Sequence, residues 1–170
     1  MKIFVRAAGL SLAIASGSSA IADEASIVPA DPWEIIHVAR ALGPAEVKRD
    51  AFNDPQIVGN VPEREGEAPG LNYTIEFYGC DLGRDCETIL FVARIAKPAW
   101  AKDAPQADLF TDWNGEKLIG RARLDELNQA VLEHPVPMRA GLPKETLLQT
   151  FELWQIALRE FAEHVESEGE

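Results

Sequence analysis

Apolar residues recur at intervals of three and four positions near the C-terminal end of the chain, and this is the clearest pattern in the sequence. The positions in this stripe are Leu147, Phe151, Trp154, Leu158, Phe161 and Val165. Such spacing places the side chains on one face of an amphipathic helix. We expect a helix from Pro143 to about Val165. Its apolar face is more typical of a helix that covers a β-sheet than of a dimerisation seam.

A second helix is predicted near the start of the folded region, where residues that favour a helix start follow one another. Asp31 suits the N-cap, Pro32 suits the first helical position, and Glu34 supplies the acid of a capping box. Apolar residues at helical spacing follow, and Gly43 ends the pattern. The sequence therefore predicts a helix over residues 32–42.

Between these two helices the pattern changes to that of strands. Two short strands are predicted between residues 45 and 61, on either side of the turn-forming residues 53–55. Residues 73–78 alternate between apolar and polar, which predicts a strand with one solvated face. Residues 88–95 are almost continuously apolar, which predicts a strand covered on both faces. A short loop joins the last two strands, so we expect them to pair antiparallel.

The region before the last helix predicts a short helix and a hairpin. The helix is expected from about residue 104 to Trp113, with the pair Asn114-Gly115 as its left-handed stop. The hairpin is expected from residues 117–125 and 129–137. The fold class that these elements predict is α+β: a single domain with an antiparallel β-sheet. An N-terminal helix, a short middle helix and a long C-terminal amphipathic helix are expected to flank that sheet.

The first residues of the chain have the features of an export signal. Lys2 and Arg6 give a basic start, residues 7–15 form an apolar run, and Ala20-Ile21-Ala22 matches the rule for signal peptidase cleavage. The apolar run is shorter than the roughly 20 residues that span a bilayer, so a retained anchor is disfavoured. We expect cleavage after Ala22 and a periplasmic or secreted protein.

The expected organisation is a signal peptide, one domain and short flanking segments. Residues 1–22 form the cleaved signal peptide, and residues 23–30 form an N-terminal linker. Residues 31–166 form the α+β domain, and residues 167–170 form an acidic tail. A chain of 170 residues is of the usual size for one domain with its own core.

The charge of the chain excludes some partners. The sequence has 28 acidic and 16 basic residues, and its formal net charge is −12. Loss of Lys2 and Arg6 with the signal peptide would make this charge more negative still. Such a surface repels phosphate backbones and anionic headgroups. We therefore expect neither a nucleic acid partner nor, after signal cleavage, a membrane partner.

The two cysteines predict a disulfide. Cys80 and Cys86 bracket a short polar loop, and an exported chain matures in a compartment where thiols oxidise. Their spacing differs from that of a zinc ribbon and from the C-x-x-C of redox catalysts. We expect one structural disulfide that closes the loop between the two central strands.

No motif in the sequence specifies a reaction. After the predicted cleavage site the only serines are Ser26 and Ser167, and no nucleophile elbow surrounds either of them. His37, His134 and His164 lie on separate predicted elements, without the spacing of a metalloprotease. Phosphate-binding glycine motifs are also missing from the sequence. We therefore expect a protein that is not an enzyme, with no cofactor and no metal.

Four residues are candidates for binding a partner or a ligand. Trp113 could fill the core or offer a stacking surface, and Asn114 is expected to end the helix beside it. Arg121 and Arg123 share one face of a predicted strand. They are positive charges in an acidic chain, so they could pair with acids of the same chain or with an incoming carboxylate.

Several motifs in order resemble those of the YbjN-domain family, which consists of bacterial proteins described as sensory transduction regulators. The motifs are Phe77-Tyr78-Gly79-Cys80, Cys86, Trp113-Asn114, the strand Gly120 to Asp125, and Trp154 in the last helix. The resemblance covers about residues 31–165. That family looks like the fold of type III secretion chaperones, so the resemblance implies an interaction role rather than a catalytic one.

The functional hypothesis is an exported, non-enzymatic protein-interaction module with a chaperone-like or regulatory role. The partner is expected to be another protein or a second copy of the chain, bound through a sheet edge or a helix face. The alternative is a small-ligand sensor or enzyme with a pocket between the sheet and the helix that ends at Trp113.

Overall fold

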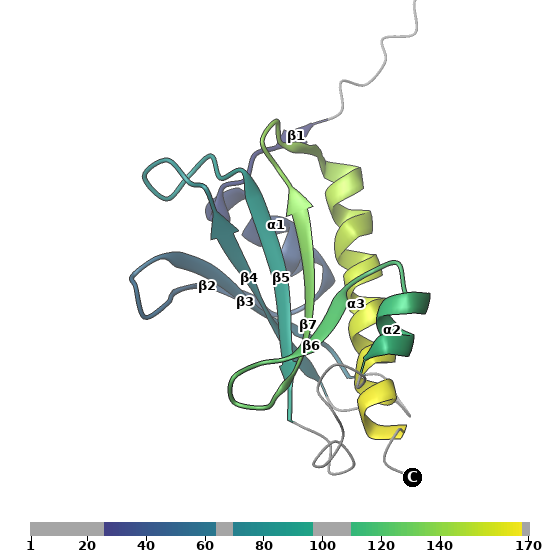
Figure 1. Ribbon diagram of the computed structural model, residues 1–170. Helices are drawn as coiled ribbons and strands as arrows, with labels where there is room; N and C mark the ends of the chain where they lie inside the picture. The colour runs from purple at the N-terminus through teal and green to yellow at the C-terminus, as the bar shows by residue number, and fades with distance from the viewer. Residues whose placement is uncertain (1–25, 64–69, 97–109, 168–170) are drawn as a thin grey trace, which may run out of the picture.

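Six strands form one antiparallel sheet, and three helices accompany it in an α+β arrangement (Figure 1). The computed structural model describes residues 26–63, 70–96 and 110–167. In spatial order the strands are β2 (Ala45–Arg49), β3 (Pro55–Val61), β4 (Leu71–Tyr78), β5 (Thr88–Ile95), β7 (Ala130–Pro137) and β6 (Arg121–Leu124). The helices are α1 (Pro32–Leu42), α2 (Thr111–Glu116) and α3 (Lys144–Ser167). The expected fold class is confirmed.

The N-terminal helix forms where the capping residues predicted it. The Asp31 side chain accepts a hydrogen bond from the N–H of Trp33 at 2.8 Å, and Pro32 occupies the first turn. This cap satisfies one of the backbone donors that a helix start leaves free. Ile35 and Ala39 are fully buried, and α1 contacts β2, β3 and α3.

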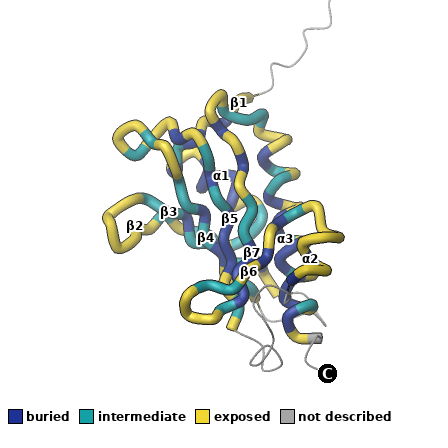
Figure 2. Tube along the Cα trace, in the orientation of Figure 1, coloured by how far each residue is buried: buried dark blue, intermediate teal, exposed yellow. Residues whose placement is uncertain are grey.

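The long C-terminal helix covers one face of the sheet, as its apolar stripe predicted. All six stripe residues are buried to 2% exposure or less. The ring of Phe151 meets Phe91 of β5 edge to face at 4.9 Å between centroids, and Trp154 lies 5.4 Å from the same ring. Each such side chain contributes about 1.5–3 kcal/mol by leaving water. Figure 2 shows the buried side of α3 turned toward the strands.

The expectation that β5 is covered on both faces was wrong. Helices α1 and α3 lie on one side of the sheet, and no helix of the described residues lies on the other (Figure 1). On that outer face Val92 is only 1% exposed because it stands in the middle of the sheet, opposite Thr74 on one side and Glu133 on the other. Neighbouring side chains of the same sheet therefore shelter it.

The middle helix also differs from the prediction. It runs from Thr111 to Glu116, so Asn114 and Gly115 lie inside it and do not stop it; neither has a positive φ. The N–H of Lys117 bonds to the carbonyl of Trp113 at the end of the helix. The reason is tertiary: the Asn114 side chain is held by strand β6, as described below. The earlier part of the predicted helix, residues 104–109, lies outside the described residues.

Two boundaries shift because of a small second sheet. Strand β1 (Ile27–Val28) pairs antiparallel with β8 (Leu142–Pro143), so the segment expected as a linker contains a strand. Pro143 belongs to β8, and α3 begins one residue later. The predicted signal peptide and nearly all of the predicted acidic tail lie outside the described residues. None of the helices in the described part of the chain combines the length and apolar character that a membrane crossing requires.

The last hairpin forms as expected, but its first strand is shorter. Strand β6 begins at Arg121 and not at Lys117, because Gly120 has a φ of +81°, which breaks the extended run. Leu118, expected on the strand, is 97% exposed. The register of β6 with β7 places Ala122 opposite Leu132, and Ala122 is buried toward the core.

Candidate functional site

The disulfide loop joins the ends of β4 and β5. Cys80 and Cys86 are bonded in the structure, and Cys86 is buried. The N–H of Cys86 donates to the carbonyl of Ala30 at 3.2 Å, and Arg84 lies 3.7 Å from the carboxylate of Asp31. Closing a loop of this size stabilises a fold by about 2 kcal/mol in the chain-entropy estimate. The loop is thus fixed to the start of α1.

The tip of this loop exposes an apolar side chain. Asp81 and Arg84 exchange two backbone hydrogen bonds of 2.8 and 2.9 Å, which leaves Leu82 and Gly83 as the two turn residues. Both have positive φ, +48° and +77°, as in a type I′ turn. A left-handed conformation costs a residue such as leucine about 1–2 kcal/mol. Leu82 nevertheless occupies it, with 98% of the residue exposed.

A second tight turn, between β2 and β3, presents an aromatic ring. The carboxylate of Asp50 accepts from the N–H groups of Phe52 and Asp54 at 2.8 and 2.9 Å. Arg49 donates to the carbonyl of Asn53 at 2.7 Å. These bonds hold the turn in one shape, and Phe52 at its tip is 86% exposed.

A hollow of about 380 Å³ lies between this turn and the end of β4. Its lining residues are Asp50, Phe52, Asp54, Pro55, Gln56, Glu76, Phe77 and Tyr78. The hydroxyl of Tyr78 donates to Glu76 at 2.6 Å, and this bond, with burial second, raises the pKa of Tyr78 to about 12. A Cβ added at Gly83 would lie 3.9 Å from Pro55, so the disulfide loop borders the same region.

One edge of the main sheet is closed by a side chain. The N–H and carbonyl groups of Ala122 in β6 point away from β7. The reason is that the residue pairs on either side of Ala122 make the hydrogen bonds between the two strands. The amide of Asn114 bonds to both: its Nδ2 donates to the Ala122 carbonyl at 2.9 Å, and its Oδ1 accepts from the N–H at 2.8 Å. An asparagine side chain thus takes the place of a neighbouring strand.

The opposite edge, β2, is open. Because Asn60 donates to Pro44 at 2.9 Å, the alternation of the ladder directs the backbone of Val47 away from β3. Arg40 covers the carbonyl of Ala45 at 3.0 Å. Within residues 26–63, 70–96 and 110–167, no group bonds to the N–H or carbonyl of Val47 on that side.

Trp113 fills the core and offers no stacking surface. It is 2% exposed, its Nε1 donates to the Gly120 carbonyl at 3.2 Å, and its ring meets Phe161 at 5.1 Å between centroids. The ring of His164 lies 5.6 Å away. Of the two readings of Trp113, the structure supports burial.

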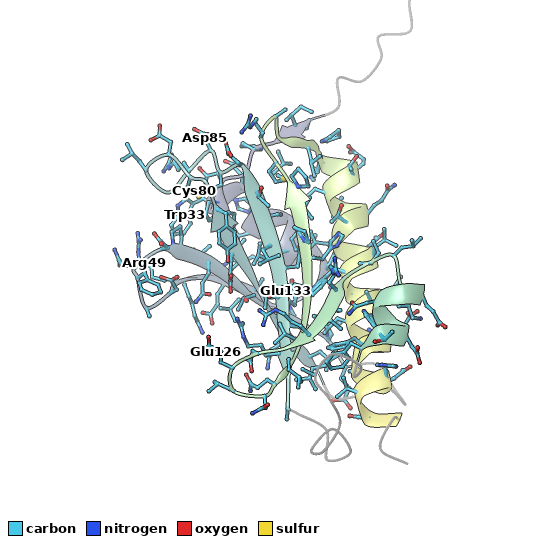
Figure 3. The ribbon with its side chains drawn as sticks, in the orientation of Figure 1. Trp33, Arg49, Cys80, Asp85, Glu126 and Glu133 are labelled. Atoms are coloured by element: carbon cyan, nitrogen blue, oxygen red, sulfur yellow. A yellow bond between two sulfur atoms is a disulfide. The ribbon has the colours of Figure 1, made fainter. Side chains whose placement is uncertain are left out.

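Arg121 and Arg123 both lie exposed on β6. Arg123 forms an ion pair with Glu133 of β7, and this hydrogen bond raises the pKa of the guanidinium. Figure 3 labels Glu133, which lies on the sheet.

A hollow of about 690 Å³ lies between α2 and β6. It is lined by Phe110, Thr111, Asn114, Gly115, Ala122, Arg123 and Leu124. Its Asn114 amide and Arg123 guanidinium already have partners in the chain.

The described residues contain no group of three or more His, Cys, Asp or Glu side chains that could hold an ion. His134 is half-buried, and burial lowers its pKa, as is usual for a neutral histidine in a core.

The exposed tips Phe52 and Leu82 and the sealing role of Asn114 were not expected from the sequence. Leu82 before a glycine in a short loop was the only local signal.

Comparison with known proteins agrees with this fold. The structure matches the crystal structure of YbjN from E. coli, described as "a putative transcription regulator", with a TM-score of 0.51 and 20% sequence identity. The match covers 82% of this chain and 96% of that chain. A chain of the HopA1–SchA chaperone–effector complex matches with a TM-score of 0.41 and 21% identity, over 73% of this chain and 88% of that one.

No curated protein sequence matches the chain. The model of the YbjN family, described as "putative bacterial sensory transduction regulator", matches residues 54–167. This region contains the disulfide loop, Asn114 with its strand, and the whole of α3. It begins after α1 and β2, so it is shorter than the resemblance expected from the sequence motifs. Since the match covers more than half of the sequence, the chain belongs to the YbjN family.

Proposed function

We propose that this chain is an exported, non-enzymatic interaction module that binds a protein partner by adding the partner's strand to the β2 edge. The observation that carries the proposal is the difference between the two edges of the sheet. Exposed edges pair readily with other chains, and proteins usually block them. Here β6 is blocked by Asn114, and β2 is left open at Val47.

The open edge is short, which limits the contact. Strand β2 has five residues, and its outward backbone groups belong to Ala45, Val47 and Arg49. A partner strand would gain main-chain hydrogen bonds at Val47 and Arg49, and its side chains would alternate between the two faces of the sheet. A regulatory role for such binding is in keeping with the description of the family.

Strand addition can be tested by removing one donor. Val47→Pro deletes an outward N–H without breaking a ladder bond to β3, so the fold should persist and pairing should fail. Leu124→Pro is the matched control, because Leu124 also points its N–H outward, from the sealed edge, and is also partly buried against the core. Val47→Thr keeps the N–H and controls for the side chain.

Proteins captured from cell-envelope extract would be compared among these variants, with circular dichroism to verify folding. We expect a partner that is recovered with the wild type, Leu124→Pro and Val47→Thr but lost with Val47→Pro. Equal recovery with all folded variants would refute strand addition. Sedimentation at several concentrations shows whether the partner is a second copy of the chain.

Export is supported by the signal sequence and by the disulfide loop. N-terminal sequencing of the protein from the envelope should begin at Asp23, directly after Ala22. A chain that still begins at Met1, or that is found in the cytosol with free thiols, would contradict this part of the proposal.

The alternative is a small-ligand sensor that uses the hollow between α2 and β6. A ligand carboxylate there would have to displace Glu133 from Arg123. Screening a metabolite library by thermal shift tests this alternative, because a ligand at 100 times its Kd stabilises the folded state by about 2.7 kcal/mol. Arg123→Ala should abolish any such shift.

A further inference from the structure

The two turns at one end of the sheet expose apolar side chains among carboxylates. We define the turn surface as Phe52, Asp54, Glu76, Tyr78 and Leu82. Phe52 and Leu82 are 86% and 98% exposed, and Tyr78 is 49% exposed. We propose that the turn surface is the recognition site for a basic segment of the partner protein, one with an apolar side chain next to a lysine or arginine. The inference rests on the proposed protein binding, but not on strand pairing at β2.

Hydrogen bonds and the disulfide within the chain keep the apolar side chains of this surface exposed. The β2–β3 turn is fixed by two hydrogen bonds to the Asp50 carboxylate. The disulfide loop is closed covalently and by the paired backbone of Asp81 and Arg84. Rigid turns lose little conformational freedom on binding, so exposed Phe52 and Leu82 are well suited to act as anchors.

The charge of the region specifies the partner. The nearby cations already have partners: Arg49 bonds to the Asn53 carbonyl, and Arg84 lies beside Asp31. By contrast, no salt bridge to Asp54, Asp81 or Asp85 occurs among the described residues. Figure 3 shows Arg49, Cys80 and Asp85 on the same side of the molecule in this view. Glu76 is engaged by Tyr78 and lies 3.9 Å from Arg94, so an incoming cation would pair first with the Asp54 carboxylate.

The hollow offers a place for that cation. Its volume of about 380 Å³ lies between the Asp54 turn and the Tyr78 end of β4. The Tyr78 hydroxyl is engaged by Glu76, which fixes the ring. Aromatic rings beside carboxylates attract ammonium and guanidinium groups through both charge and the ring quadrupole. A lysine or arginine side chain can thus enter while its apolar neighbour contacts Phe52 or Leu82.

The turn surface also lies next to the open edge. Asp50, which begins the turn, directly follows Arg49, the last residue of β2. A partner strand that pairs with β2 and continues past Arg49 reaches this turn within one or two residues, since each residue spans about 3.3 Å. One partner segment can therefore use both features.

The test uses the full oxidised protein, immobilised, and random short peptides displayed on phage as the probe. We expect the enriched peptides to carry lysine or arginine beside an apolar residue, and their binding to weaken as salt is raised. Affinities of a synthesised winner would then be measured by calorimetry. Phe52→Ser, Leu82→Asn and Asp54→Asn should each weaken binding about tenfold, which corresponds to about 1.4 kcal/mol.

The controls separate this inference from strand pairing. Leu127→Asn removes another exposed leucine, 79% exposed on the β6–β7 hairpin, and should leave the affinity unchanged. Leu82→Asn should raise the melting temperature, since asparagine accepts a positive φ, so its loss of binding cannot be attributed to unfolding. Val47→Pro tests strand pairing in the same assay.

The outcomes are distinct. If Val47→Pro abolishes binding and the three turn variants do not, strand pairing stands and the turn surface is overturned. If only the turn variants weaken binding, the turn surface stands without strand pairing. A selection that enriches acidic or uncharged peptides, or no peptide at all, overturns the inference.

Discussion

The two faces of the sheet are stabilised by different interactions. On the inner face, Phe91 packs against Phe151 and Trp154, and all three side chains are fully buried. On the outer face, Arg123 pairs with Glu133, and Arg94 lies 3.9 Å from both Glu76 and Asp125. Close packing of apolar side chains thus organises the inner face, and pairs of opposite charges organise the outer face. The difference implies that the inner face sets stability and that the outer face is kept from associating.

The largest contrast should come from truncating one side chain on each face. Phe151→Ala on the inner face should lower the free energy of unfolding by about 3–5 kcal/mol, because it leaves a cavity against Phe91. Arg94→Ala on the outer face should lower it by less than about 1 kcal/mol, since the side chain is partly exposed. Urea unfolding followed by tryptophan fluorescence measures both. Similar losses would show that the two faces do not differ in this way.

The tyrosines give a contrast in alkaline solution. Burial raises the pKa of Tyr73, on the inner face, from 10.0 to about 12. Between pH 10 and pH 12, Tyr73 has lost its proton in the unfolded chain but keeps it in the folded chain. The free energy of unfolding therefore has its full value below pH 10 and falls as the pH rises above 10. The loss should reach about 2 kcal/mol near pH 12. Urea midpoints across this range should fall less steeply for Tyr73→Phe than for the wild type.

On the outer face, the pKa of Tyr78 depends first on its bond to Glu76 and second on burial. Glu76→Gln replaces a charged acceptor by a neutral one, so the pKa of Tyr78 should move down toward 10.0. The pKa of Tyr73 should not change. The sequence contains only these two tyrosines, so phenolate absorbance can follow both. An unchanged titration curve would mean that the bond does not control Tyr78.

The smallest effect is expected for the ion pair on the sheet. Glu133→Gln removes the partner of Arg123 and should cost roughly 0.2–1 kcal/mol at low salt. The loss should diminish at high salt, because exposed charges are screened. Thermal unfolding of both proteins at two salt concentrations measures it. A loss that does not respond to salt would point to packing over Val92 as the main role of Glu133.

Local signals in the sequence predicted most of the fold. The cap at Asp31, the alternation before Tyr78 and the stripe through Trp154 each depend on residues close in the chain, and the structure has all three elements. The same local reasoning failed at Asn114, because its partner Ala122 lies eight residues away on a strand. It also failed for β5. A continuous apolar run is found both in a strand that lies in the centre of a sheet and in a strand covered on both faces, and Val92 is buried by its neighbours in the sheet.

The candidate site was less predictable than the fold. The disulfide was predicted from two cysteines and an expected export signal, and it is present in the structure. The open edge at Val47 could not be seen, because it depends on which strands lie outermost and on how the ladder alternates. Arg123 was correctly weighed toward an ion pair. Phe52 carries no local pattern that distinguishes an exposed tip from a buried side chain, and for Leu82 the only such signal is the glycine that follows it in a short loop.

The order of the elements along the chain also bears on biosynthesis. Ile27 needs Pro143 as its strand partner, and the rings of α3 that cover the inner face follow every strand of the sheet in the sequence. A ribosome therefore delivers all six strands of the main sheet before α3 can cover their apolar side, when only α1 is available to cover part of it. During that interval the interior of the nascent polypeptide is incomplete, and the proposed export would move the chain in this loosely packed state.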